Sequence, residues 1–109
     1  MPPTPPSPVS EKVGIELQRV VERWRQLPLD HAQLYSGRVR ALVQSLADRA
    51  AQASGVPSST VPDLGPAALM DQLTVMVHDA SAIAVSSSAL TWRPAEELAS
   101  LRRELGTRV

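Results

Sequence analysis

Three segments of this chain carry apolar residues whose successive members alternate steps of three and four positions. That spacing places apolar side chains along one face of an α-helix and lets helices pack side by side at a shallow angle. The three series are Val13, Leu17, Val20, Trp24 and Leu27; Ala32, Tyr35, Val39, Leu42 and Leu46; and Leu69, Leu73, Met76, Ala80 and Ile83. No segment alternates β-branched and polar residues, so the sequence predicts helices and no sheet.

Local signals predict where four helices begin and end, over about residues 11–27, 30–54, 66–86 and 94–105. Ser10 is a favourable cap for the first helix, and Pro28 cannot continue it. For the second helix, Asp30 and Gln33 have the spacing of a capping box, and Leu29 and Leu34 that of a hydrophobic staple. The short connection between these two helices predicts an antiparallel hairpin.

The third and fourth helices each begin at a proline, Pro66 and Pro94, a residue favoured in the first helical position. The connector 56–65 is rich in proline and hydroxyl residues, and it is long enough to carry the chain to a new position in the bundle. The predicted fold class is therefore all-α, an up-and-down helical bundle of three long helices plus a shorter C-terminal fourth. Residues 10–109 form this single domain, and residues 1–9, five of them proline, form a disordered tail.

Composition restricts the chemistry available to the chain. With 109 residues, 43% of them hydrophobic but only 3% aromatic, the core must be mainly aliphatic. The absence of cysteine excludes disulfides, thiol catalysis and zinc sites built on cysteine. Lys+Arg and Asp+Glu are both 11, so no overall charge attracts nucleic acid or a membrane surface.

Three observations bear on where the protein works. Asp71, His78 and Asp79 interrupt the most apolar stretch, 66–85, and argue against a membrane span. The first residues hold no basic region followed by an apolar run, so we expect no signal peptide and a cytoplasmic protein. The excess of Arg over the single Lys12, together with the absence of Asn, is typical of a GC-rich bacterial genome.

The sequence contains no motif typical of a catalytic or a metal-binding site. The serines cluster in predicted loops without a Gly-x-Ser-x-Gly turn, and no glycine-rich phosphate loop exists, so we expect no enzyme and no cofactor. His78 has Asp71 one heptad before it and Asp79 beside it, but the His-x-x-x-His and Glu-x-x-His pairs of helical metal sites are absent. We therefore expect His31 and His78 to be surface residues and predict no metal.

Several arginines offer an alternative function. Arg38 and Arg40 in the second helix and Arg102 and Arg103 in the fourth can form an anion or nucleic-acid patch if the two helices are neighbours. Pairing with nearby carboxylates is the simpler expectation, because the charges of the two signs are interspersed. Binding to nucleic acid is therefore an alternative and not our first prediction.

The side of the third helix away from its apolar series holds more apolar residues than one buried face requires. Val75, Ala82 and Val85 lie there beside His78, and Trp92 follows in a connector. We predict that these five residues form an interaction surface. The expected function is a non-catalytic protein–protein interaction or scaffold module, first of all a homodimer. Besides the nucleic-acid regulator, a small-ligand or metal-binding bundle using Asp71 and His78 stays open.

Overall fold

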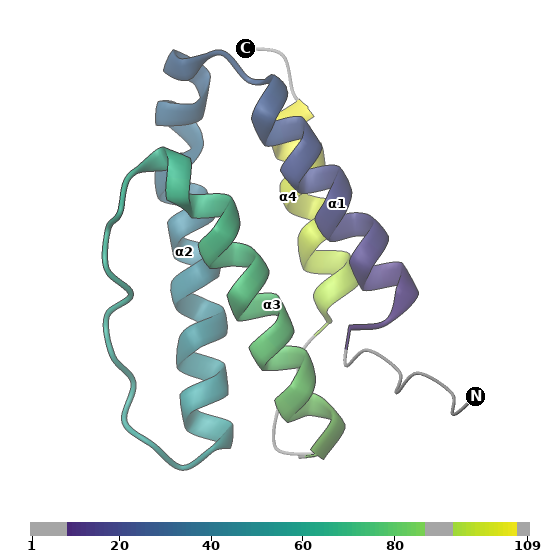
Figure 1. The fold of residues 1–109 in the computed structure, drawn as a ribbon, viewed down its shortest axis with the longest axis vertical. Coiled ribbons are helices and arrows are strands. Elements are labelled where there is room, and N and C mark those ends of the chain that lie inside the picture. The colour runs from purple at the N-terminus through teal and green to yellow at the C-terminus, as the bar shows by residue number, and fades with distance from the viewer. Residues whose placement is uncertain (1–8, 87–92, 107–109) are drawn as a thin grey trace, which may run out of the picture.

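Four α-helices make up most of the described chain (Figure 1). They are α1 (Glu11–Gln26), α2 (Leu29–Ala53), α3 (Leu69–Ser86), which follows the 3-10 turn η1 (Pro66–Ala68), and α4 (Pro94–Gly106). The computed structural model describes residues 9–86 and 93–106, without the side chains of Val85 and Ser86. Within these ranges there is no strand, which confirms the all-α class with three long helices and a shorter fourth. The predicted tail up to residue 8 lies outside the described residues.

The first helix begins as its sequence predicts. The Ser10 hydroxyl accepts a hydrogen bond from the Val13 backbone N–H at 3.3 Å, which satisfies one of the unpaired donors of the first turn. Val13, Leu17, Val20 and Trp24 are buried along one face, and the helix ends at Gln26, two residues before Pro28. The spacing of three and four residues therefore identified the buried face of α1 correctly.

The start of the second helix differs from the prediction. The capping position is Pro28, no side chain caps the helix, and Asp30 lies inside the first turn. Leu29 and Leu34 are each 70% exposed, so the predicted hydrophobic staple does not form. The reason is the extended backbone of Pro28 (φ −57°, ψ 152°), which turns the chain into the helix two residues before Asp30 can act as a cap.

Two glycines bound the connector between α2 and the turn that precedes α3. Gly55 (φ 71°) ends α2 and Gly65 (φ 87°) precedes η1, and this left-handed backbone region favours glycine at both turns. Between them the chain runs back along α2 (Figure 1). As a result α2 and α3 run in the same direction, and the bundle departs at this step from the predicted up-and-down alternation. The length of the connector makes the crossover possible.

Side chains of α2 fasten this returning segment. The Gln44 side-chain amide donates to the Ser59 carbonyl at 3.0 Å, and its oxygen accepts from the Val61 N–H at 2.8 Å. Arg40 forms an ion pair of 3.0 Å with Asp63. These three contacts hold a segment without secondary structure along the helix from which it came.

The core lies where two helix pairs meet. α1 lies beside α4, and α2 lies beside α3 (Figure 1). The largest fully buried side chains come from all four helices and are aliphatic: Val20, Val39, Val43, Leu46, Leu73, Val77, Leu98, Leu101 and Leu105. At about 25 cal/mol per Å² of apolar surface, burial of such side chains is the main stabilising contribution.

The buried face of α3 is rotated relative to the predicted series. Met70 and Val77 are buried, whereas Met76 and Ile83 are only partly buried. α3 contacts α2 on one side and α1 on the other, so its buried face is centred between them, at Leu73 and Val77. The predicted series followed the α2 side alone.

Candidate functional site

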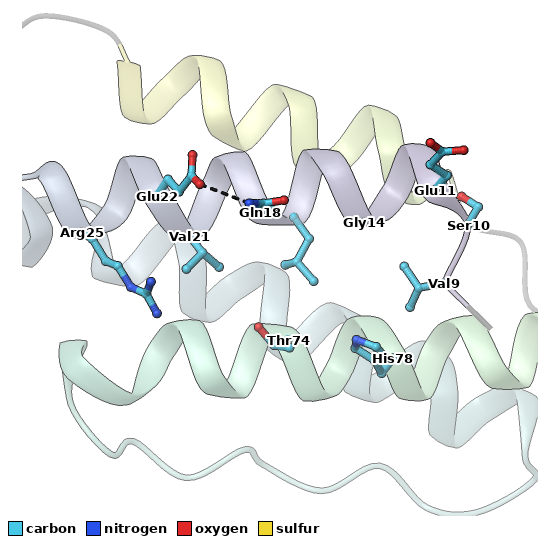
Figure 2. A pocket seen from close by; sticks show the side chains of 11 residues that line it. Val9, Ser10, Glu11, Gly14, Gln18, Val21, Glu22, Arg25, Thr74 and His78 are labelled. Atoms are coloured by element: carbon cyan, nitrogen blue, oxygen red, sulfur yellow. Dashed lines mark hydrogen bonds between the residues drawn. The ribbon is translucent and has the colours of Figure 1, made fainter. Parts of the chain in front are cut away.

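A groove of about 480 Å³ lies between α1 and α3 (Figure 2). Its apolar part comes from Val9, Leu17 and Val21, with Gly14 between them. Polar and charged residues border it: Ser10, Glu11, Gln18, Glu22 and Arg25 from the α1 side, and Thr74 and His78 from α3. Figure 2 shows Val21 and Arg25 pointing from α1 toward α3, with Thr74 and His78 opposite. We call this site the α1/α3 groove.

Helical spacing brings the lining residues of each wall together. In α1, Gly14, Leu17 and Val21 are three and four positions apart, and in α3 Thr74 and His78 are four apart, so each set shares one face. Gly14 widens the groove because it has no side chain. A Cβ built there would meet only the Val9 Cγ1 atom, at 3.9 Å, which is ordinary van der Waals contact.

The polar groups on the α3 wall do not bridge to α1. The Thr74 hydroxyl donates to the Met70 carbonyl of its own helix at 2.7 Å. His78 is exposed, and the residues described offer it no hydrogen-bond or ion-pair partner. Because no polar contact pulls α1 and α3 together here, the space between them stays open to solvent.

The border of the groove is more acidic than basic. Glu11 and Glu22 contribute carboxylates, and Arg25 is the one cation among the lining residues. Gln18 donates to Glu22 at 3.3 Å, a neutral contact that leaves the carboxylate charge in place. Glu11 and Arg25 form no ion pair with any described residue, so both charges are available to a ligand.

Three of the five residues predicted as an interaction surface are exposed on α3. Val75 is 52% exposed, and His78 and Ala82 are exposed as well, with His78 also lining the α1/α3 groove. Asp71 and Asp79 are exposed on the same helix. The Val85 side chain and Trp92 lie outside the described residues. We call Val75, His78 and Ala82 the outer face of α3; its role as an interaction surface stays a prediction.

The predicted arginine patch is divided among different partners. Arg38 pairs with Glu104 of α4 at 2.9 Å, and Arg102 pairs with Glu16 of α1 at 3.0 Å. Arg40 instead points to the returning segment, where it pairs with Asp63. Arg103 is exposed in the last turn of α4. The first three cations thus meet a separate carboxylate each, which lowers their attraction for an external anion.

A second cluster of arginines was not visible in the sequence. Arg19, Arg23 and Arg102 line a recess of about 290 Å³ where α1 and α4 end. Glu16 accepts from both Arg102 and Arg19, at 3.0 and 3.4 Å, and Arg23 donates to the Leu105 carbonyl at 3.4 Å. The cluster joins residues more than 80 positions apart, which periodicity within one helix cannot reveal.

Two further findings concern the described residues as a whole. Among them, no three His, Asp or Glu side chains converge in a way that could hold a metal ion. None of the helices in the same ranges combines the length and the apolarity that crossing a membrane requires. When the chain is compared with protein-family models, with curated proteins and with solved structures, none of the three comparisons finds a match.

Proposed function

We propose that this protein is a non-catalytic, cytoplasmic protein–protein interaction module that binds through the α1/α3 groove and the adjoining outer face of α3. The observation that carries the proposal is the apolar surface left over once the core is complete. The buried residues of α3 already pack in the core, yet Val75 is 52% exposed and Val21 in the groove is only partly buried. Apolar surface bordered by polar residues is typical of protein interfaces.

The two alternatives have weaker support. A nucleic-acid regulator needs free cations on one surface, but Arg38, Arg40 and Arg102 each pair with a carboxylate. A metal-binding or small-ligand bundle would use Asp71 and His78, which lack a third ligand among the described residues. A salt titration with a fluorescent duplex tests the first alternative, and metal analysis of the purified protein beside His78→Ala tests the second.

Self-association through the outer face of α3 is the first form of the proposal to test, because a second copy is the partner always present. Light scattering at high micromolar concentration should report a dimer for the wild type and a monomer for Val75→Asp, since a carboxylate on an apolar interface is costly. Val56→Asp is the matched control, because Val56 is 54% exposed and belongs to the connector, not to α3. A monomer that Val75→Asp leaves unchanged excludes the homodimer and leaves a different protein as the partner.

A further inference from the structure

We infer that the occupant of the α1/α3 groove is one amphipathic helix of another protein, with Lys or Arg beside its apolar stripe. This inference rests on the proposed function and adds the shape and the charge of the partner. Three observations support it: the dimensions of the groove, the helical nature of both walls and a border that carries two carboxylates, Glu11 and Glu22, against one arginine, Arg25.

The dimensions of the groove suit a helix of about four turns. Both Ser10 and Arg25 line it, so it follows α1 over most of that helix. At about 1.5 Å per residue this distance is about 22 Å, the length of about fifteen helical residues. Val21 is partly buried and Leu17, one turn before it, is 7% exposed, so Val21 offers the larger apolar contact to a side chain of a partner helix.

The walls favour a helix over an extended peptide. Both α1 and α3 use their backbone groups within the helix, and the described residues include no strand whose edge could pair with another strand. An extended peptide in the groove would find no strand edge for its backbone donors and acceptors, whereas a helix satisfies them internally. A third helix laid between two antiparallel helices also reproduces ordinary bundle packing.

The charges favour a basic partner. Elsewhere on the molecule Glu16, Glu97, Glu104 and Asp63 each pair with an arginine of another element. Glu11 at the groove, and Asp71 and Asp79 on the exposed side of α3, have no cationic partner among the described residues. α3 itself contains no Lys or Arg. Lysines beside the apolar stripe of a partner would meet these carboxylates, which raises the association rate and the specificity.

The test uses three fluorescein-labelled helical peptides of about fifteen residues, the length that the groove accommodates. The first has a leucine stripe flanked by lysines, the second has the same stripe flanked by glutamates, and the third keeps the lysines but replaces leucine by serine. Fluorescence anisotropy measures the affinity of the full chain for each peptide. We expect the first to bind at least about tenfold more tightly than the other two, since both the apolar anchors and the flanking charges contribute.

Gly14→Leu is the variant that blocks the groove without disturbing the fold. The site of the new Cβ is free of close contacts, and the change removes a glycine from a helix interior, so the variant should fold. Gly37→Leu is its control, because Gly37 is also helical and open to space but lies on α2. We expect Gly14→Leu to weaken binding of the leucine–lysine peptide at least about tenfold and Gly37→Leu to leave it unchanged.

Replacing the two carboxylates at the border of the groove tests whether charge contributes to binding. Glu11→Gln with Glu22→Gln should weaken the leucine–lysine peptide several-fold, while Asp30→Asn with Glu96→Gln, which changes the net charge equally, should not. If the glutamate-flanked peptide binds as tightly as the leucine–lysine peptide, the partner need not be basic, but the groove is still a binding site for a helix. If the serine peptide binds as tightly as the leucine–lysine peptide, binding depends on charge alone, and the inference is overturned. Should no peptide bind, the helical occupant is excluded, and the proposed function then depends on the light-scattering result with Val75→Asp.

Discussion

The Val61 N–H donates a hydrogen bond of 2.8 Å to the Gln44 side-chain oxygen, across 17 positions of the chain. The same side chain donates to the Ser59 carbonyl and to Asp48, at 3.0 and 2.8 Å. One glutamine of α2 therefore fixes the crossover segment and, through it, the parallel arrangement of α2 and α3 (Figure 1). Two further polar contacts hold this segment: Arg40 pairs with Asp63, and the Gln72 side chain donates to the Pro62 carbonyl at 2.9 Å.

Gln44→Ala should destabilise the fold. The substitution leaves the partly buried Val61 N–H without its acceptor, which costs about 1–3 kcal/mol in the free energy of unfolding. Urea denaturation followed by circular dichroism measures the change. Gln33→Ala is the control on the same helix, because Gln33 is exposed, and its effect should stay within about 0.5 kcal/mol. Equal effects of the two substitutions would show that Gln44 does not fasten the segment.

Replacing Gly55 and Gly37 by alanine should change stability in opposite directions. Gly55 has a φ of 71°, where alanine is strained by about 1 kcal/mol, so Gly55→Ala should lower the free energy of unfolding. Gly37 lies inside α2 with open space around its Cβ position, so Gly37→Ala should raise that free energy by up to about 1 kcal/mol. Thermal unfolding of both variants and the wild type measures the two changes. A loss of stability in Gly37→Ala would contradict the open space around the Gly37 Cβ position.

Ser81→Ala should stabilise the protein by about 0.5–1 kcal/mol, because it removes a buried hydroxyl and improves helix propensity. Ser81 is 6% exposed, and its hydroxyl has no hydrogen-bond partner within the described ranges. Ser36→Ala is the comparison, since the Ser36 hydroxyl is partly buried but donates to the Ala32 carbonyl at 2.7 Å. A midpoint of urea unfolding that falls for Ser81→Ala would indicate a partner for the hydroxyl.

Helix existence was predictable because its causes are local. Ser10 and Pro94 predict the first residues of α1 and α4. The spacing of three and four positions identified the buried residues of α1. The start of α2 was misplaced by one residue because two signals compete there, and Pro28 prevails over Asp30. The direction of α3 was not predictable, since it depends on contacts of Gln44 and Arg40 with a segment far along the chain.

The candidate site was predictable only in part. Surplus apolar residues on the third predicted helix drew attention to Val75 and His78, which the structure places on its exposed side. The α1 wall of the groove was not predicted, because Gly14, Leu17 and Val21 do not stand out from the ordinary helical periodicity of α1. A groove depends on the distance between two helices, and the sequence of either helix alone does not contain that distance.

The α1/α3 groove as a binding site for a basic helix is tested most directly by a titration in which each backbone amide reports its own environment. We would record ¹⁵N–¹H correlation spectra of the full chain while adding the leucine–lysine peptide. This binding mode predicts shifts concentrated at residues 10–25 on the face that holds Gly14 and Val21, and at Thr74 to Ala82 of α3. Shifts centred instead on the recess of Arg19, Arg23 and Arg102, or no shifts at high peptide excess, would contradict it.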